Sequence, residues 1–172
     1  MATACDPLSF KVFEKAAKSA LGKLCPASGA SSRISELTEP QSRSAFNFLS
    51  GNDTFVSLPT GHGKSLIYQI CPMIAKELAS VENRFPSDPM LVVISPLNSL
   101  IADQINSCER MGLKACKVEL ETTATLQKGC DRQLLYASPE IFENEDARKL
   151  LQMYCDRIIG VVVDESHCIV QW

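Results

Sequence analysis

Long apolar stretches are missing from this sequence, and no hydrophobic run approaches the roughly 20 residues that a membrane-spanning helix needs. The first ten residues also lack a basic segment followed by an apolar one, which argues against a secretory signal. With 45% hydrophobic and 22% charged residues among 172, the composition is that of a globular domain. We therefore expect an intracellular protein with no membrane contact.

An excess of positive charge is also missing, since the formal net charge is −3. This argues against a histone-like or tail-mediated nucleic-acid binder, but a nucleic-acid motor can hold a strand through one local groove and backbone amides. The eight cysteines include no C-x-x-C pair, and there are only two histidines. We therefore expect no zinc in this segment and reduced thiols, several of them in the core.

The periodicity of apolar residues divides the chain into two parts. Residues 6–24 are typical of a helix, with Asp6 or Ser9 as its cap, and a small, polar linker follows at 25–32. From residue 33 onward we predict the main domain. Its first helix covers residues 40–49.

Short apolar runs alternate with helical stretches in the main domain. The predicted strands are 54–58, 91–94, 115–118, 133–137 and 158–163, and the predicted helices are 64–79, 98–111 and 146–153. This order predicts an α/β fold, a mostly parallel sheet with helices on both faces. Ligands bind beyond the carboxyl ends of the strands in such sheets.

The first predicted strand leads into L-P-T-G-H-G-K-S at residues 58–65. Gly61 and Gly63 allow the backbone to curl so that its amides converge on phosphate oxygens. Lys64 would reach the β- and γ-phosphates of ATP, and the Ser65 hydroxyl would ligate Mg²⁺. The candidate nucleotide-binding residues are Thr60, Gly61, His62, Gly63, Lys64 and Ser65.

The alternative for this segment is a tight strand-to-helix turn with a solvated lysine. Leu58 stands where the general phosphate-loop pattern has glycine, and His62 occupies a position that is free to vary. Thr60, the strand before the loop and the helix after it favour the nucleotide interpretation.

The last predicted strand delivers Asp164 and Glu165 at its carboxyl end. Adjacent carboxylates leaving a buried strand need a cation, because unpaired buried charge is costly. Asp164 would hold Mg²⁺, and Glu165 would orient and deprotonate the attacking water. The alternative is that the two acids cap a following helix. His167 could relay the state of the nucleotide toward DNA.

Four segments together resemble the RecQ family of helicases. They are L-P-T-G-H-G-K-S-L-I-Y-Q at 58–69, S-P-L-N-S-L-I-A-D-Q at 95–104, L-Y-A-S-P-E at 135–140 and D-E-S-H-C-I-V-Q-W at 164–172. The last resembles a DEAH-type box that continues into the aromatic-rich loop of the family. Ser166 stands where the box usually has alanine, and Glu39-Pro-Gln41 departs from the family's usual Arg-Pro-x-Gln.

The resemblance implies a RecA-like P-loop NTPase domain that uses ATP and Mg²⁺, within a 3′-to-5′ DNA helicase of the nucleus that acts on single-stranded DNA and duplex junctions. Gln41 matches the residue that reads adenine. The residues that match DNA-contacting positions are Ser95, Pro96, Leu97, Ser138, Pro139, Glu140 and Trp172. As alternatives, Asn98 and Ser138-Pro-Glu140 make good helix starts, and Trp172 could belong to the core.

The resemblance also implies a domain that stops after its Walker B strand, with the second motor domain missing and one strand absent between the phosphate-loop strand and the Asp164 strand. We therefore expect this chain alone to be poorly stable, to bind nucleotide weakly and not to unwind DNA. Three functions remain open: a RecQ-like DNA helicase, an RNA helicase or other translocase of the same superfamily, and a truncated, non-catalytic ATP-binding module.

Overall fold

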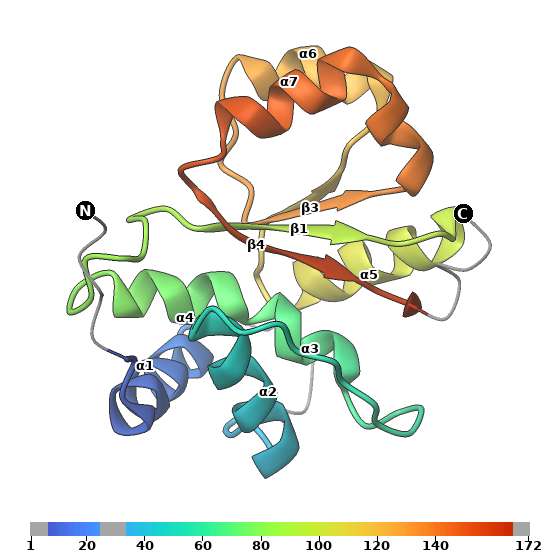
Figure 1. Ribbon diagram of the computed structural model, residues 1–172. Coiled ribbons are helices and arrows are strands. Elements are labelled where there is room, and N and C mark those ends of the chain that lie inside the picture. Colours follow the sequence, from blue (N-terminus) through green and yellow to red (C-terminus); the bar gives the residue numbers. More distant parts are fainter. Residues whose placement is uncertain (1–6, 25–33, 167–172) are drawn as a thin grey trace.

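The computed structural model describes residues 7–24 and 34–166, which form a parallel sheet between two layers of helices (Figure 1). The sheet has four strands in the order β2-β3-β1-β4, and all neighbouring pairs are parallel. The strands are β1 (Met90–Ile94), β2 (Ala115–Lys117), β3 (Leu134–Ala137) and β4 (Ile158–Val163). The predicted α/β class, with a parallel sheet, is confirmed.

Alternate side chains of the strands enter two separate cores. Leu91 and Val93 of β1 pack with the helices of one layer, whereas Met90 packs with the other layer. The first layer contains α1 (Phe10–Gly22), α2 (Glu39–Leu49), α3 (Lys64–Gln69), α4 (Cys71–Leu78) and α5 (Asn98–Arg110). The second contains α6 (Leu120–Gln127), the 3-10 turn η1 (Pro139–Glu143) and α7 (Glu145–Met153). Helices therefore cover both faces of the sheet, as predicted.

The N-terminal helix α1 packs against α4. Phe13, Ala20 and Leu21 are buried in the same core as the sheet residues of that face. At the surface, Lys23 pairs with Glu77 of α4 at 2.6 Å, and the Ser19 hydroxyl donates to the same carboxylate at 2.7 Å. Helix α1 is thus a packed part of the domain surface.

The predicted strand at 54–58 is wrong, because this segment is irregular and pairs with no strand of the described sheet. It faces β4 across a cavity that both line. A strand needs a hydrogen-bonding neighbour, and within residues 7–24 and 34–166 no strand pairs with this segment. For the same reason β4 is an edge strand, not the buried strand that its sequence suggests, and Val161 remains 54% exposed.

The predicted helix at 64–79 is divided into α3 and α4 at Ile70. Pro72 lies in the first turn of α4 and has no amide hydrogen, so a continuous helix would lose one backbone bond there. The apolar residues Ile67, Ile70 and Ile74 of this segment are all buried on both sides of the break.

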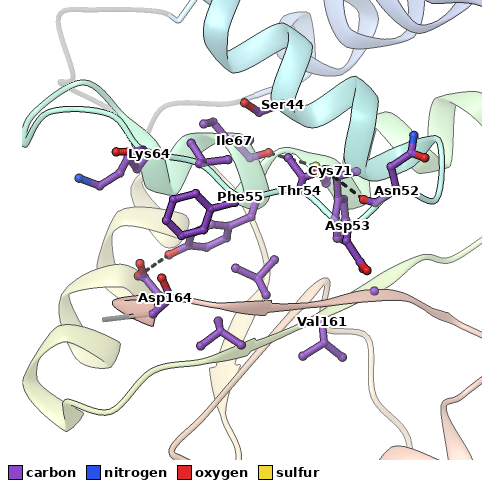
Figure 2. Close-up of a pocket in the computed structure, with 18 of the residues that line it drawn as sticks. Ser44, Asn52, Asp53, Thr54, Phe55, Lys64, Ile67, Cys71, Val161 and Asp164 are labelled. Atoms are coloured by element: carbon purple, nitrogen blue, oxygen red, sulfur yellow. Dashed lines mark hydrogen bonds between the residues drawn. The ribbon is translucent and has the colours of Figure 1, made fainter. Parts of the chain in front are cut away.

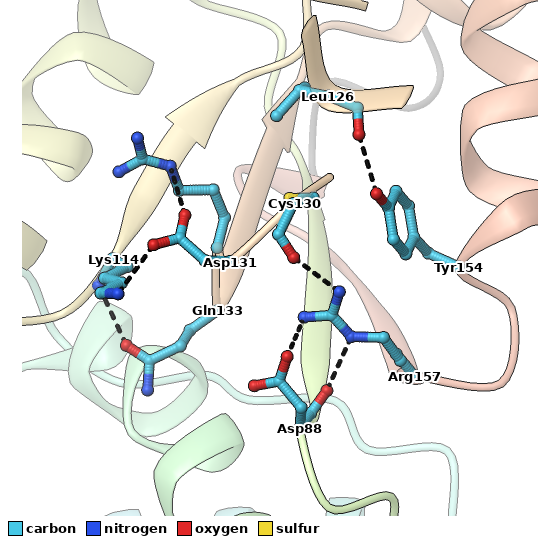
Figure 3. A network of polar contacts seen from close by, with 9 residues as sticks. Asp88, Lys114, Leu126, Cys130, Asp131, Gln133, Tyr154 and Arg157 are labelled. Carbon is cyan, nitrogen blue, oxygen red and sulfur yellow. Dashed lines mark hydrogen bonds and ion pairs between the residues drawn. The ribbon is translucent and has the colours of Figure 1, made fainter. Parts of the chain in front are cut away.

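Arg157 ties together the chain segments that enter β1, β3 and β4 (Figure 3). Its Nε donates to the Asp88 carbonyl at 2.9 Å, and one terminal nitrogen donates to the Cys130 carbonyl at 2.6 Å. The other terminal nitrogen lies 2.5 Å from the Asp88 carboxylate. The guanidinium group also lies over the ring of Tyr154. These contacts fix the amino-terminal side of the sheet, opposite the predicted site.

Several cysteines fill the core, as expected. Cys71, Cys108 and Cys130 are buried. Burial raises the pKa of the Cys71 thiol to about 12 and that of Cys108 to about 11, so neither is a reactive thiolate near neutral pH. Among the helices formed by residues 7–24 and 34–166, none combines the length and hydropathy that a membrane crossing requires.

Candidate nucleotide-binding site

The phosphate loop is built on two left-handed glycines. Gly61 has φ +82° and Gly63 has φ +70°, and residues with a Cβ rarely adopt this conformation. Beneath the loop, the buried amide of Gln41 donates to the carbonyls of His62 and Gly63, at 3.2 and 3.3 Å. Its oxygen accepts from the Thr38 amide at 2.9 Å, which caps α2. Gln41 therefore fastens the loop to the start of α2.

The side chains of Lys64 and Ser65 in the loop form hydrogen bonds within the domain. The Lys64 ammonium group donates to the Leu58 carbonyl at 2.9 Å, across the mouth of the loop. The Ser65 hydroxyl accepts from the Gln104 side chain of α5 at 3.0 Å. The His62 ring is exposed, and its Nδ1 lies 3.3 Å from the Thr60 carbonyl, so this side chain stays with its own loop.

The acidic pair follows directly after β4. The backbone amide of Asp164 donates to the Ile94 carbonyl at 2.9 Å, which continues the β1–β4 ladder up to the acid. The two carboxylate oxygens of Asp164 accept from the Glu165 amide at 3.0 Å and from the Tyr68 hydroxyl at 3.1 Å. Glu165 has φ +52°, an uncommon conformation for a residue with a side chain. The carboxylate of Asp164 is thus held in one orientation.

Lys64, Asp164 and Glu165 line the same cavity, which has a volume of about 940 Å³. In Figure 2, Lys64 and Asp164 lie toward one end, and Asn52, Asp53 and Thr54 lie toward the other. Apolar side chains such as Phe55 and Val161 form walls between these ends. The lysine and the two carboxylates that line the cavity have the charges that a triphosphate with a divalent cation requires.

The sequence matches the DEAD/DEAH box helicase family over residues 38–172. It is 31% identical over 140 residues to an ATP-dependent DNA helicase RecQ of Synechocystis. It is also 31% identical over 131 residues to the ATP-dependent helicase wrn-1 of Caenorhabditis elegans, and 33% identical over 134 residues to the ATP-dependent helicase SGS1 of Saccharomyces cerevisiae. The chain belongs to the RecQ group of DEAD/DEAH box helicases.

These alignments cover most of the chain but little of each relative. They include 77%, 73% and 72% of this chain, and 27%, 11% and 9% of the respective relatives. The RecQ match supports the RecA-like domain that the fold shows. The family match over residues 38–172 includes both the phosphate loop and the acidic pair.

The two loops that match DNA-contacting segments of RecQ helicases lie side by side. The Ser95 amide donates to the Ala137 carbonyl at 2.9 Å, so residues 95–97 and 138–140 leave adjacent strands at the same sheet edge as Asp164. Leu97 and Glu140 are exposed, and Pro96, Ser138 and Pro139 are half-buried. Ser95 is fully buried, so its side chain does not reach this surface. His167 and Trp172 lie outside the described residues.

Three polar residues beside the site were given no role from the sequence: Tyr68, Gln69 and Gln104. Each belongs to a segment that resembles a RecQ motif, and this was the only signal available for them. The structure places Tyr68 against Asp164 and Gln104 against Ser65. It buries Gln69 to 2% exposure, with its amide donating to Gln104 at 2.7 Å.

Proposed function

We propose that this chain is the ATP-binding part of an ATP-dependent DNA helicase that moves 3′ to 5′ along single-stranded DNA. One observation carries the proposal: Lys64 and the pair Asp164 and Glu165 line the same end of one cavity. They come from segments about a hundred positions apart in the sequence, and a purely structural lysine and acid pair have no need of a shared cavity.

The proposed roles follow from charge and position. Lys64 binds the terminal phosphates and gives up its bond to the Leu58 carbonyl when it does so. Ser65 and Asp164 hold the magnesium ion, which neutralises developing phosphate charge when it is bound. Glu165 accepts a proton from the attacking water. His167 relays the state of the site toward DNA.

Gln41 is proposed to serve the adenine base, as the resemblance implies. Its carbonyl oxygen and its amide nitrogen both already bond within the chain. Reading the base would require Gln41 to exchange at least one of these bonds. The same residue would then link base recognition to the shape of the phosphate loop.

The proposed DNA surface consists of the loops 95–97 and 138–140, with Trp172. Backbone amides and small polar groups in these loops would hold phosphates, while Trp172 would stack on a base. Because Ser95 is buried, its contribution would come through the loop backbone. We further propose a role in DNA repair or recombination in the nucleus.

The first experiment measures binding of a fluorescent ATP analogue to the chain with and without Mg²⁺, and then with single-stranded DNA or RNA of the same base sequence. A DNA helicase should bind the Mg²⁺ complex more tightly, and DNA should change this affinity more than RNA does, because coupling between the two sites is reciprocal. An equal or larger effect of RNA would favour an RNA-directed translocase. No nucleotide binding at millimolar concentration would refute the proposal.

A second experiment separates a catalytic motor from a non-catalytic ATP-binding module. We expect the 172-residue chain to bind nucleotide weakly and to leave a DNA duplex intact. A form that continues past Trp172 with a second motor domain should hydrolyse ATP when single-stranded DNA is present. Tight ATP binding without turnover in that longer form would identify a non-catalytic module.

A further inference from the structure

Side-chain hydrogen bonds in the interior lead to two groups of the site. The Gln69 amide donates to the Gln104 oxygen at 2.7 Å, and the Gln104 amide donates to the Ser65 hydroxyl oxygen at 3.0 Å. In a separate bond, the Tyr68 hydroxyl donates to Asp164 at 3.1 Å. These bonds therefore end on the two groups that we assign to the magnesium ion, Ser65 and Asp164.

The bonds from Gln69 through Gln104 to Ser65 fix the orientation of each next group. The Gln69 donor requires the oxygen of the Gln104 amide to face it, and this turns the Gln104 nitrogen toward Ser65. The Ser65 oxygen then accepts on one lone pair. A hydroxyl oxygen has two lone pairs, so one remains for a metal ion.

Burial makes this arrangement costly unless every member is bonded. Gln69 is 2% exposed and Tyr68 is 7% exposed, and a buried amide or hydroxyl without a partner is strongly unfavourable. Apolar side chains of similar volume could fill these positions. Buried polar residues that are fully hydrogen-bonded give a core a unique arrangement. Here that arrangement includes the partners of Ser65 and Asp164, the groups that we assign to the magnesium ion.

These hydrogen bonds join three parts of the domain. Gln69 and Tyr68 belong to α3, Gln104 belongs to α5, and Asp164 follows β4. The first turn of α5 comes directly after the loop 95–97. A displacement of α5 by a strand bound at that loop would therefore change the contact of Gln104 with Ser65.

We propose that Gln104 is a positioning residue that orients the Ser65 hydroxyl for magnesium through its hydrogen bond to the Ser65 oxygen. This rests on the proposed nucleotide-binding function of the site. Gln104 bonds Ser65 and touches no reacting atom in this role. The function of Gln104 is to keep one lone pair of Ser65 available and directed toward the metal position.

The test measures how much Mg²⁺ is needed to promote binding of a fluorescent ATP analogue to the chain. Gln104→Met keeps the length and helical preference of the side chain but removes its amide. We expect the half-saturating Mg²⁺ concentration to rise roughly 5- to 10-fold, by the loss of about one hydrogen bond. Affinity for the analogue without Mg²⁺ should stay within about twofold. Asn106→Ala, at an exposed position of α5, should change neither value.

A second variant tests the same contact through the residue that orients Gln104. Gln69→Met removes the donor to the Gln104 oxygen and should raise the Mg²⁺ requirement in the same direction. The double variant with Gln104→Met should be no worse than the more affected single variant, because both changes act on the same contact with Ser65. If Gln104→Met melts much earlier than the unmodified chain, Gln69→Met alone decides the matter.

The outcomes separate this inference from the proposed function. An unchanged Mg²⁺ requirement in both single variants would overturn the inference while leaving nucleotide binding intact. Equal losses of affinity for the ATP analogue with and without Mg²⁺ would show a general structural role and would also overturn the inference. Additive effects of Gln69→Met and Gln104→Met would refute a shared action on Ser65. If the unmodified chain binds nucleotide without any response to Mg²⁺, the proposed metal site and this inference both fail.

Discussion

The Tyr68 hydroxyl donates to the Asp164 carboxylate at 3.1 Å, although 96 positions separate the two residues in the sequence. Burial is the main cause that raises the pKa of the Tyr68 phenol above its usual value, so the phenol remains a protonated donor. This bond connects the helix after the phosphate loop to the acid that follows β4. It is a direct contact between the two halves of the candidate site.

Tyr68→Phe should lower the free energy of unfolding by about 1 kcal/mol, the usual contribution of one hydrogen bond. Urea denaturation followed by circular dichroism measures this change. The matched control is Tyr154→Phe, which removes a 2.8 Å bond to the Leu126 carbonyl in the other core. Both variants should lose similar stability, but only Tyr68→Phe should raise the Mg²⁺ requirement for nucleotide. An equal change in the Mg²⁺ requirement of both variants would contradict the assignment of Tyr68 to the site.

Lys64→Ala and Glu165→Gln should affect different steps. Removing the lysine charge should weaken nucleotide binding at least about 10-fold, because a charge-assisted contact with phosphate is lost. Glu165→Gln should leave binding within about twofold but reduce ATP turnover at least about 100-fold, since the general base is gone. Turnover is measured as phosphate release in a form with both motor domains. Full turnover by Glu165→Gln would exclude this residue as the base.

Substitution of the two loop glycines should have unequal effects. Both have positive φ, so alanine costs roughly 1–2 kcal/mol at either position. A Cβ on Gly63 would also lie 2.6 Å from the Gln41 nitrogen, whereas nothing lies within 4 Å of one on Gly61. Gly63→Ala should therefore destabilise the chain by about 1 kcal/mol more than Gly61→Ala, as it displaces the Gln41 amide from its bonds.

The background variant Gln41→Ala tests this explanation. It removes the group that the new methyl would meet, so the difference between the two glycine substitutions should nearly disappear. Melting temperatures of the four variants suffice for the comparison. A difference that persists without the Gln41 side chain would mean that backbone strain alone separates the two positions.

Arg157→Met should lower the free energy of unfolding by about 2 kcal/mol, because two backbone carbonyls lose a charged donor. The nucleotide site lies at the opposite end of the strands, so its affinity for nucleotide should not change in the folded fraction. Lys149→Met is the control, since its exposed pairs within α7 contribute little. Denaturant titration compares the two. Equal stability of both variants would show that Arg157 does not fasten the strand entries.

Local patterns were enough to predict most of the elements. The predicted bounds of β1, β3 and β4 are correct to within one residue at each end, because strands of a parallel sheet between helices have continuous apolar sequences. The segment 54–58 has the same kind of sequence but forms no strand, since strand formation depends on a neighbouring strand that local sequence cannot supply. The break at Ile70 is readable from Pro72, which has no amide hydrogen to donate.

The sequence by itself determined the chemistry available to this protein: a glycine-curled loop with Lys64 and Ser65, two acids after an apolar strand, and the order of motifs. Only the tertiary structure decided how these groups meet, with Gln41 beneath the loop, Gln104 on Ser65 and Tyr68 on Asp164. The physical reason is that residue type and spacing determine which chemical groups are present and which local backbone conformation they adopt. Hydrogen bonds between distant segments form only when the core brings those segments within bonding distance.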